Sequence, residues 1–337
     1  RNGSSLIAVS MNAPLEQGFH IVGAHTDSPC LKLKPNASYR NHGYLQLGVE
    51  VYGGALLAPW FDRDLSIAGR LTVTARNGQI VNRNIDFKRA VATIPSLAIH
   101  LNRDVNDKLE INRQTHLPPV LALIEEDVDL HTILLEQLHL QYPDQDFETV
   151  LAHELSLYDT QAPAIIGLHK QLLASARLDN LLSSYIALRS LLEQDDQQNS
   201  IVVLTDHEEV GSSTASGAAG PFLESVLRQI CDDENRYRTA IECSLLISAD
   251  NAHAVHPNYA DRHEPRHQPG MNKGLVIKIN HNQRYASNSE TQGLFMQLCQ
   301  RVDVPCQQFV VRSDMGCGST IGPITATELG VRTIDIG

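Results

Sequence analysis

The chain has 337 residues, of which 42% are hydrophobic and 20% charged, and its formal net charge is −12 at pH 7. This composition predicts a water-soluble globular protein, long enough for one large domain or two of moderate size. It has no run of about 18 apolar residues that could span a membrane, and its acidic balance argues against nucleic-acid binding, which needs clustered Lys and Arg.

The first part of the chain predicts a buried strand followed by a strand-rich segment. Residues 19–24, FHIVGA, form the core strand, and the pattern changes from about residue 36. Alternation of polar and apolar residues then predicts strands, with Asn77-Gly78 closing a hairpin. The predicted elements of this segment are strands at 43–54 and 148–159, a hairpin over 68–87 and a helix over 127–142.

From Leu178 onward, helices and strands alternate as in α/β proteins. The predicted helices are 178–194, 220–233 and 289–302, and the predicted strands are 200–206, 244–250, 274–280, 307–314 and 331–337. We therefore predict an α/β core made of residues 1–35 and 173–337, with a strand-rich domain, residues 36–172, inserted after the first core strand. Such an insertion is tolerated where its two ends lie close together at the surface.

The cysteines indicate the cellular location of the protein, and the chain ends indicate whether the sequence continues. Six cysteines are scattered without a CxxC pair, which predicts reduced thiols and a cytoplasmic location. The sequence has no initiator Met and no signal segment, and it stops on what reads as a buried strand. We therefore expect further sequence at both ends.

One histidine and several carboxylates occur at the ends of predicted strands and at the start of one helix. They are His25, Asp27, Asp179, Glu208, Glu209 and Asp250. In an open α/β sheet, ligand-binding residues gather at the carboxyl ends of the strands. One imidazole and several carboxylates suit Zn²⁺ or Mn²⁺. The pattern predicts a metal site at this edge.

Each of these residues has a plainer interpretation. His25 and Asp27 could form a hydrogen-bonded loop pair, and Asp179 could favour a helix N-terminus. The two adjacent glutamates could form a solvated turn, and Asp250 could cap a loop. The metal interpretation is stronger because the residues occur at successive strand ends, and because adjacent carboxylates repel each other where no cation is present.

The tandem Glu208 and Glu209 also indicate hydrolytic chemistry. In a two-metal hydrolase, one carboxylate bridges the ions and others hold each ion singly. A further carboxylate, free of metal, takes a proton from the attacking water and passes it to the leaving amine. Neighbouring residues on a turn can divide these two tasks.

Several sequence blocks resemble the aspartyl aminopeptidases, a family of dinuclear zinc metallopeptidases, and the bacterial members most of all. In chain order they include GAHTDSPCLKLKP, GVEVYGG, WFDRDLSIAGR, ARLDNL, DHEEVGS, SADNAHAVHPNY and CGSTIGPI. The resemblance spans the whole chain. It implies a zinc-peptidase-type three-layer core with an inserted dimerisation domain, and a homo-oligomer, a dodecamer built from dimers. The implied reaction is removal of N-terminal Asp or Glu from peptides.

The resemblance also implies a set of ligands. His25 and Asp250 would hold one zinc ion, Glu209 would hold a second, and Asp179 would bridge the two. Mn²⁺ or Co²⁺ would be substitutes. The family's final His ligand follows the strand that matches RTIDIG, whereas this sequence stops at Gly337. We therefore expect the second ion to bind more weakly to this chain.

The remaining roles implied by the resemblance concern catalysis and substrate. Glu208 would be the general base, and Asp27 would orient His25. His100, in the LAIH motif of the inserted domain, would reach the active site of a neighbouring subunit. Lys278, in VIKIN, would bind the acidic side chain of the substrate, although a lysine on a surface strand is the plainer interpretation of that residue.

Two rival functions are open at this stage. The same metal chemistry could serve a broad aminopeptidase, a carboxypeptidase or a deacylase. Alternatively, the chain could be a non-catalytic assembly or scaffold whose insertion drives oligomerisation. Glu208 is needed only for chemistry, so its presence favours an enzyme.

Overall fold

The structure is a computed structural model that describes residues 1–126, 128–194 and 197–337. The chain divides into two compact units. Unit 1 comprises Arg1–Ser28 and Arg177–Gly337, and unit 2 comprises Pro29–Ala176. The boundaries expected from the sequence fall inside β3 (Cys30–Asn41) and at the start of β10 (Leu172–Ala174). Both strands pair within unit 2, so the observed divisions come just outside them.

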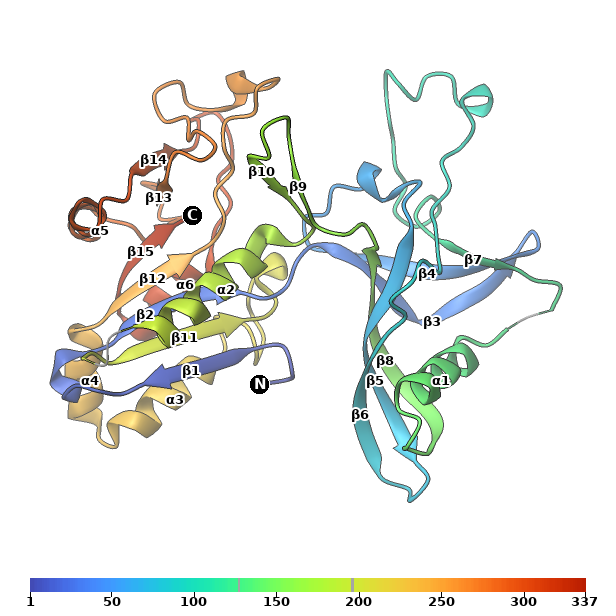
Figure 1. Cartoon of the computed structure of the whole chain (residues 1–337), viewed down its shortest axis with the longest axis horizontal. Helices are drawn as coiled ribbons and strands as arrows, with labels where there is room; N and C mark the ends of the chain where they lie inside the picture. Colours follow the sequence, from blue (N-terminus) through green and yellow to red (C-terminus); the bar gives the residue numbers. More distant parts are fainter. Residues whose placement is uncertain (127, 195–196) are drawn as a thin grey trace. The chain divides into compact units, whose positions relative to one another are not determined.

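Unit 1 is built on a mixed sheet. Within the described residues it has seven strands in the order β1-β11-β2-β12-β15-β13-β14 (Figure 1). The strands are β1 (Leu6–Ser10), β2 (His20–His25), β11 (Ser200–Thr205), β12 (Leu245–Ala249), β13 (Leu275–Ile279), β14 (Cys306–Val310) and β15 (Arg332–Ile336). The neighbours β11, β2, β12 and β15 run parallel. Their carboxyl ends therefore meet at one edge of the sheet.

Helices cover both faces of this sheet, which gives unit 1 three layers. They are α2 (Leu178–Glu193), α3 (Phe222–Cys231), α4 (Glu234–Glu242), α5 (Ser289–Arg301) and α6 (Ile321–Leu329). Ala24 packs with α2, whereas Ile21 of the same strand packs on the other face with α3, α4 and α6. The cluster of α5 contains Ile247, the register partner of Val22, so α5 shares the face of α2. The predicted α/β class is confirmed.

Helix α4 is an element of unit 1 that the sequence does not predict. Its sequence, ENRYRTAIE, is mostly polar and too short to show a clear apolar period. The helix forms because the side chain of Asp233 caps the backbone N–H groups of Asn235 and Arg236. Burial of Tyr237 and Ile241 then fixes it on the sheet. Helix α4 is therefore stabilised by its N-terminal cap and by tertiary contacts, and an apolar period in the sequence does not reveal either of them.

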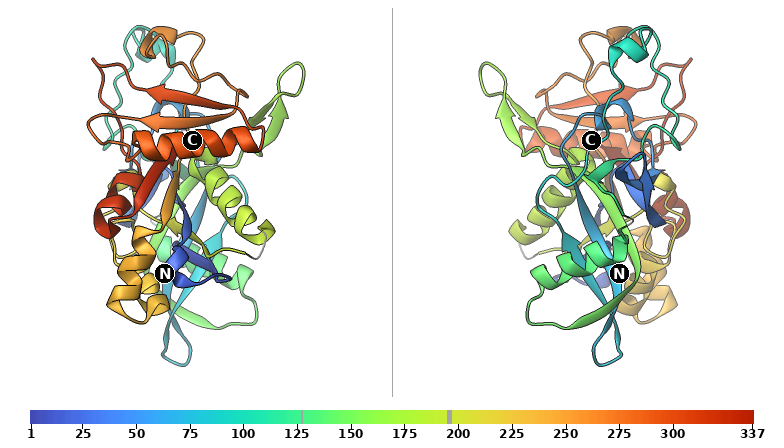
Figure 2. Two further views of the ribbon diagram at one scale, coloured as in Figure 1. Left: turned by 90° about the vertical axis from the view of Figure 1, so that its left-hand side faces the viewer. Right: turned by 90° about the vertical axis from the view of Figure 1, so that its right-hand side faces the viewer.

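Unit 2 contains a six-stranded antiparallel sheet in the order β6-β5-β8-β3-β4-β7 within the described residues. Besides β3, its strands are β4 (Tyr44–Tyr52), β5 (Leu65–Ala75), β6 (Ile80–Asp86), β7 (Val120–Leu123) and β8 (Phe147–Asp159). The predicted hairpin at Asn77-Gly78 joins β5 and β6, and Gly78 has a φ of +79°. The hairpin of β9 (Ala164–Ile166) and β10 stands away from this sheet (Figure 2).

Helix α1 (Leu130–Gln141) covers part of the unit 2 core. It buries Leu130, Leu134 and Leu138, which recur every four residues along one helix face. The observed helix begins three residues later than the helix predicted over 127–142. At its start, the side chain of Asp129 caps the N–H of His131. Asp127, the first residue of the predicted helix, lies outside the described residues.

Short 3₁₀ helices complete the chain. They are η1 (Leu15–Gln17), η2 (Ala58–Trp60), η3 (Ile99–Leu101), η4 (Glu208–Val210) and η5 (Ala260–Arg262). Among the described residues, none of the helices combines the length and hydrophobicity that a membrane span requires. The six cysteines are free thiols, in agreement with the sequence prediction.

Candidate metal centre

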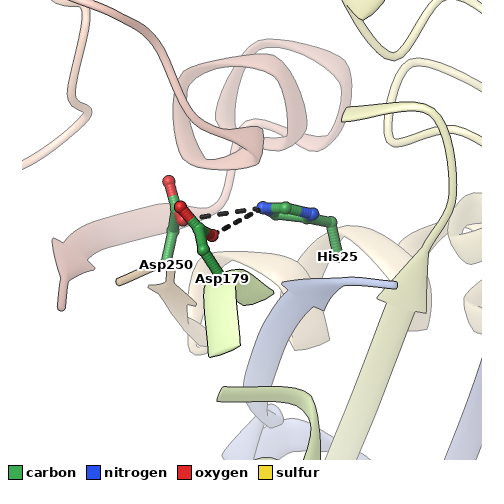
Figure 3. Close-up of side chains that lie close together, drawn as sticks. All are labelled: His25, Asp179 and Asp250. Atoms are coloured by element: carbon green, nitrogen blue, oxygen red, sulfur yellow. Dashed lines mark ion pairs between the residues drawn. The ribbon is translucent and has the colours of Figure 1, made fainter. Parts of the chain in front are cut away.

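The carboxyl edge of the unit 1 sheet brings together three of the predicted ligands. His25, the last residue of β2, is 2% exposed, and Asp250 directly follows the neighbouring strand β12. Nε2 of His25 lies 3.4 Å from Oδ1 of Asp179 and 3.6 Å from Oδ1 of Asp250 (Figure 3). Residues far apart in the sequence therefore meet because parallel strands end at one edge.

Glu208 and Glu209 form a second group with the same histidine. They open η4, just after β11, the other neighbour of β2. One ligand atom from each of His25, Glu208 and Glu209 lies within 4.8 Å of the others, and the same holds for His25, Asp179 and Asp250. Two candidate metal-binding groups therefore share one imidazole.

Asp27 connects the ring of His25 to the loop that bears the glutamates. Nδ1 of His25 lies 3.0 Å from the backbone oxygen of Asp27 and 3.4 Å from its Oδ1. The same carboxylate accepts hydrogen bonds of 3.1 Å from the backbone N–H groups of Glu208 and Glu209. Because Nδ1 is engaged here, Nε2 is the nitrogen that faces the other carboxylates.

Lys278 of β13 also belongs to this cluster. It is 4% exposed, so the alternative of a surface lysine does not hold. Its Nζ lies 3.3 Å from Oδ2 of Asp250 and donates a 3.2 Å hydrogen bond to the backbone oxygen of Asn251. The structure thus places one buried ammonium group beside a predicted ligand.

His100 lies elsewhere in the chain. It sits in η3 of unit 2, where its side chain is exposed. It is not among the unit 1 residues that form the two groups around His25. Of the predicted site residues, all except His100 therefore gather within unit 1.

The cluster is acidic and partly buried, which perturbs its protonation. Burial raises the pKa of Glu208 and of Glu209 to about 7; the charge of His25 opposes this rise and nearby carboxylates add to it. Burial lowers the pKa of His25, but the neighbouring carboxylates of Asp179, Asp250 and Asp27 outweigh that effect and raise it to about 12. Protons thus compensate a concentration of negative charge that a metal cation would neutralise instead.

The residues present fit a zinc ion. Oδ1 of Asp250 is buried and has no hydrogen-bond partner in the part of the chain that the structure describes, since Nε2 of His25, at 3.6 Å, lies beyond hydrogen-bond distance. A buried carboxylate oxygen without a hydrogen bond is costly and therefore uncommon. One imidazole nitrogen and several carboxylate oxygens are donors that zinc accepts in catalytic sites.

Comparison with known proteins agrees with this chemistry. The family model described as "Aminopeptidase I zinc metalloprotease (M18)" matches residues 1–337. The chain belongs to the M18 family of zinc aminopeptidases. The "Probable M18 family aminopeptidase 2" of Pseudomonas paraeruginosa is 58% identical, over all of this chain and 79% of that relative. The protein of the same description from Pseudomonas entomophila is 57% identical over the same shares.

Solved structures of the family share the fold of this M18 aminopeptidase. A chain in the cryo-EM structure of the Ape4 and Nbr1 complex superposes with a TM-score of 0.96 at 39% identity, over 100% of this chain and 69% of that one. The M18 aminopeptidase from Thermotoga maritima superposes with a TM-score of 0.84 at 26% identity, over 99% of this chain and 77% of that one. The predicted family is confirmed, and with it a zinc-dependent aminopeptidase activity.

The sequence analysis missed two residues of this aminopeptidase that contact the ligand segments. Asn180 and Asn251 stand directly after Asp179 and Asp250. Their side-chain amides bond to backbone oxygens across the site. Adjacency to a predicted ligand was a signal in the sequence, but one sequence does not reveal the partner of an amide.

Zinc is expected to stabilise this M18 chain against heat. Binding to the folded state alone adds about 2.7 kcal/mol at a free zinc concentration 100-fold above Kd. Calorimetric unfolding with zinc, and again after chelation, measures the effect as a higher Tm in zinc. The His25→Ala variant removes the imidazole shared by both groups and should lose the zinc-dependent shift. An equal shift in that variant would place the ion elsewhere.

Proposed function

We propose that this M18 aminopeptidase removes N-terminal Asp and Glu from peptides. The observation that supports this specificity is the buried ammonium group of Lys278 beside the candidate metal centre. An ammonium group has three N–H donors. One bonds to the backbone oxygen of Asn251 and a second faces Asp250. Nζ also lies 5.7 Å from the centroid of the Tyr285 ring, and the third N–H would bind a substrate carboxylate in a charge-assisted contact.

We further propose that two zinc ions bind, with Mn²⁺ or Co²⁺ as substitutes. His25 and Asp250 would hold the first ion, Glu209 would hold the second, and Asp179 would bridge them. The two groups that share His25 support a pair of neighbouring ions. The carboxylate of Asp179 is 57% exposed, which suits a bridging position open to substrate. A zinc titration of the metal-free chain should show a tighter and a weaker step.

The residues of the chain would then divide the reaction as follows. Bound zinc supplies Lewis-acid polarisation of the scissile carbonyl and lowers the pKa of water to about 7. The carboxylate of Glu208 accepts a proton from the attacking water and delivers it to the leaving amine. Asp27 fixes the position of Glu208 through the backbone N–H and keeps the His25 ring in place.

A homo-oligomer, a dodecamer built from dimers, is part of the same proposal. The mApe1 of S. cerevisiae, a dodecamer, superposes on this chain with a TM-score of 0.81 at 29% identity. Unit 2 bears exposed apolar side chains, among them Leu101, Leu123 and Leu168, at 75%, 77% and 94% exposure. We assign unit 2 to dimerisation, with His100 serving the site of a neighbouring subunit. The mass in solution, measured by analytical ultracentrifugation, tests the assembly.

A peptide panel tests the substrate. Peptides that differ only in their first residue, Asp, Glu, Ala or Leu, are compared by kcat/KM in zinc or Mn²⁺. We expect the two acidic peptides to be cleaved faster than the Leu peptide by at least about 30-fold, the lower bound for a buried charge pair. A preference for Leu would indicate a broad aminopeptidase and remove the role assigned to Lys278.

A further inference from the structure

We propose that Asn180 and Asn251 form a reciprocal amide clamp that sets the spacing of Asp179 and Asp250. The clamp acts on the metal ligands assigned under the proposed function and so rests on that assignment. Neither asparagine is a ligand in it. Both are positioning residues, whose side chains cross between the two segments that bear the carboxylates.

The two hydrogen bonds run in opposite directions between the same segments. Nδ2 of Asn180 donates a 2.8 Å bond to the backbone oxygen of Ala249, the residue before Asp250. Nδ2 of Asn251 donates a 2.7 Å bond to the backbone oxygen of Leu178, the residue before Asp179. In each segment, the asparagine just after the aspartate donates its side-chain N–H to the other segment. The backbone oxygen just before the aspartate accepts the N–H that comes from the other segment.

Regular secondary structure does not join these two segments to each other at the aspartates. Asp179 and Asn180 have non-helical backbone angles, with ψ of 109° and 27°, although they lie at the start of α2. Asp250 comes after the end of β12. The backbone N–H of Asp250 bonds to the oxygen of Ile336 at 3.0 Å, which holds Asp250 to β15 but not to the segment of Asp179. The crossed amides join the two segments that bear the aspartates.

The amide orientations are well determined by their surroundings. Asn180 is 0% exposed, and its Oδ1 has no hydrogen-bond partner within the described parts of the chain. A flipped amide would bring Oδ1 against the oxygen of Ala249, so the donor must point there. The hydroxyl of Ser183, one turn into α2, donates a 3.3 Å bond to Oδ1 of Asn251 and orients that amide.

The clamp has a direct consequence for metal binding. Both carboxylates face Nε2 of the buried His25, so the separation of their backbones fixes the width of the site. A site held at the correct width binds its ion without first ordering its ligands. Partners behind metal ligands typically contribute 10- to 100-fold in metal affinity.

The test compares Asn251→Ala with a matched control, Asn199→Ala. Asn199 is buried, whereas Asn251 is half-buried, and it too bridges chain segments: its Oδ1 accepts from the N–H of Asn12 and its Nδ2 donates to the oxygen of Pro14. It precedes β11 and so lies at the opposite end of that strand from the glutamates. Zinc affinity is measured by competition with a chromogenic chelator, and urea unfolding is measured on the metal-free chains.

We expect Asn251→Ala to weaken zinc binding by 10- to 100-fold and Asn199→Ala to change it by less than about threefold. Both variants should lower the urea midpoint, because each loses side-chain amide hydrogen bonds that are at least partly buried. With Co²⁺ as a probe, the visible absorption band should change in Asn251→Ala and stay unchanged in the control. Wild-type zinc affinity with an unchanged Co²⁺ band in Asn251→Ala would overturn the clamp.

The His25→Ala variant separates failure of the clamp from failure of the assigned site. If His25→Ala loses zinc while Asn251→Ala retains it, the ligands stand and the clamp does not. If His25→Ala binds zinc normally, the ligand assignment itself is wrong, and the clamp falls with it. Zinc affinities of Asn180→Ala and of the double variant, compared with that of Asn251→Ala, measure the coupling between the two hydrogen bonds. Should those variants fail to fold, Asn251→Ala alone still decides.

Discussion

Replacing Glu208 with Gln is expected to lower kcat by about 10²- to 10⁴-fold, the usual contribution of a general acid–base group. The amide keeps the size of the side chain but cannot accept a proton from the attacking water. The backbone N–H of residue 208 still donates to Asp27, so the loop keeps its place. Steady-state kinetics on an Asp peptide, with zinc content measured on the same sample, provide the test.

The control for this experiment is Glu224→Gln, on helix α3. Glu224 is 40% exposed and pairs with Arg228 on the helix surface, so its loss should leave kcat unchanged. Near-normal turnover in Glu208→Gln would refute the assignment of Glu208 as base. Loss of turnover together with a lost zinc ion would make Glu208 a ligand instead, since its carboxylate lies in a group with His25 and Glu209.

Replacing Lys278 with Met is expected to remove the preference for acidic residues. Truncating one partner of a buried charge pair costs about 2–5 kcal/mol, so kcat/KM for the Asp peptide should fall by at least about 30-fold. The Leu peptide makes no such contact and should change by less than about threefold. The ratio of the two kcat/KM values, measured on one enzyme sample, gives the result directly.

The structure offers a specific alternative to this outcome. Nζ of Lys278 lies 3.3 Å from Oδ2 of Asp250, so the ammonium group could serve that ligand alone. In that case both peptides would lose activity equally and zinc would bind less tightly. Lys273→Met is the control, because Lys273 is exposed in the loop just before β13. That variant should match the wild type with both peptides.

Most elements of unit 1 were predictable because their apolar periods are long and clear. The strand at 200–206 and the helix at 178–194 are examples, and they correspond to β11 and α2. The boundary expected after residue 35 was less accurate, since β3 runs from Cys30 to Asn41 through a proline and polar residues. Pairing with β4 and β8 keeps this strand in unit 2. The local sequence of β3 does not reveal that β4 and β8 are its partner strands.

The residue types in the chain set the chemistry that this protein can perform. One histidine and five carboxylates at strand and helix ends predicted a metal centre, and the motif HTDSPC and its companions identified the family. Folding brings particular groups into contact. It placed Lys278 behind Asp250, crossed the amides of Asn180 and Asn251, and left His100 in the other unit. The physical reason is that residue types and spacing fix local structure, whereas side-chain partners depend on strand order and register across the whole sheet.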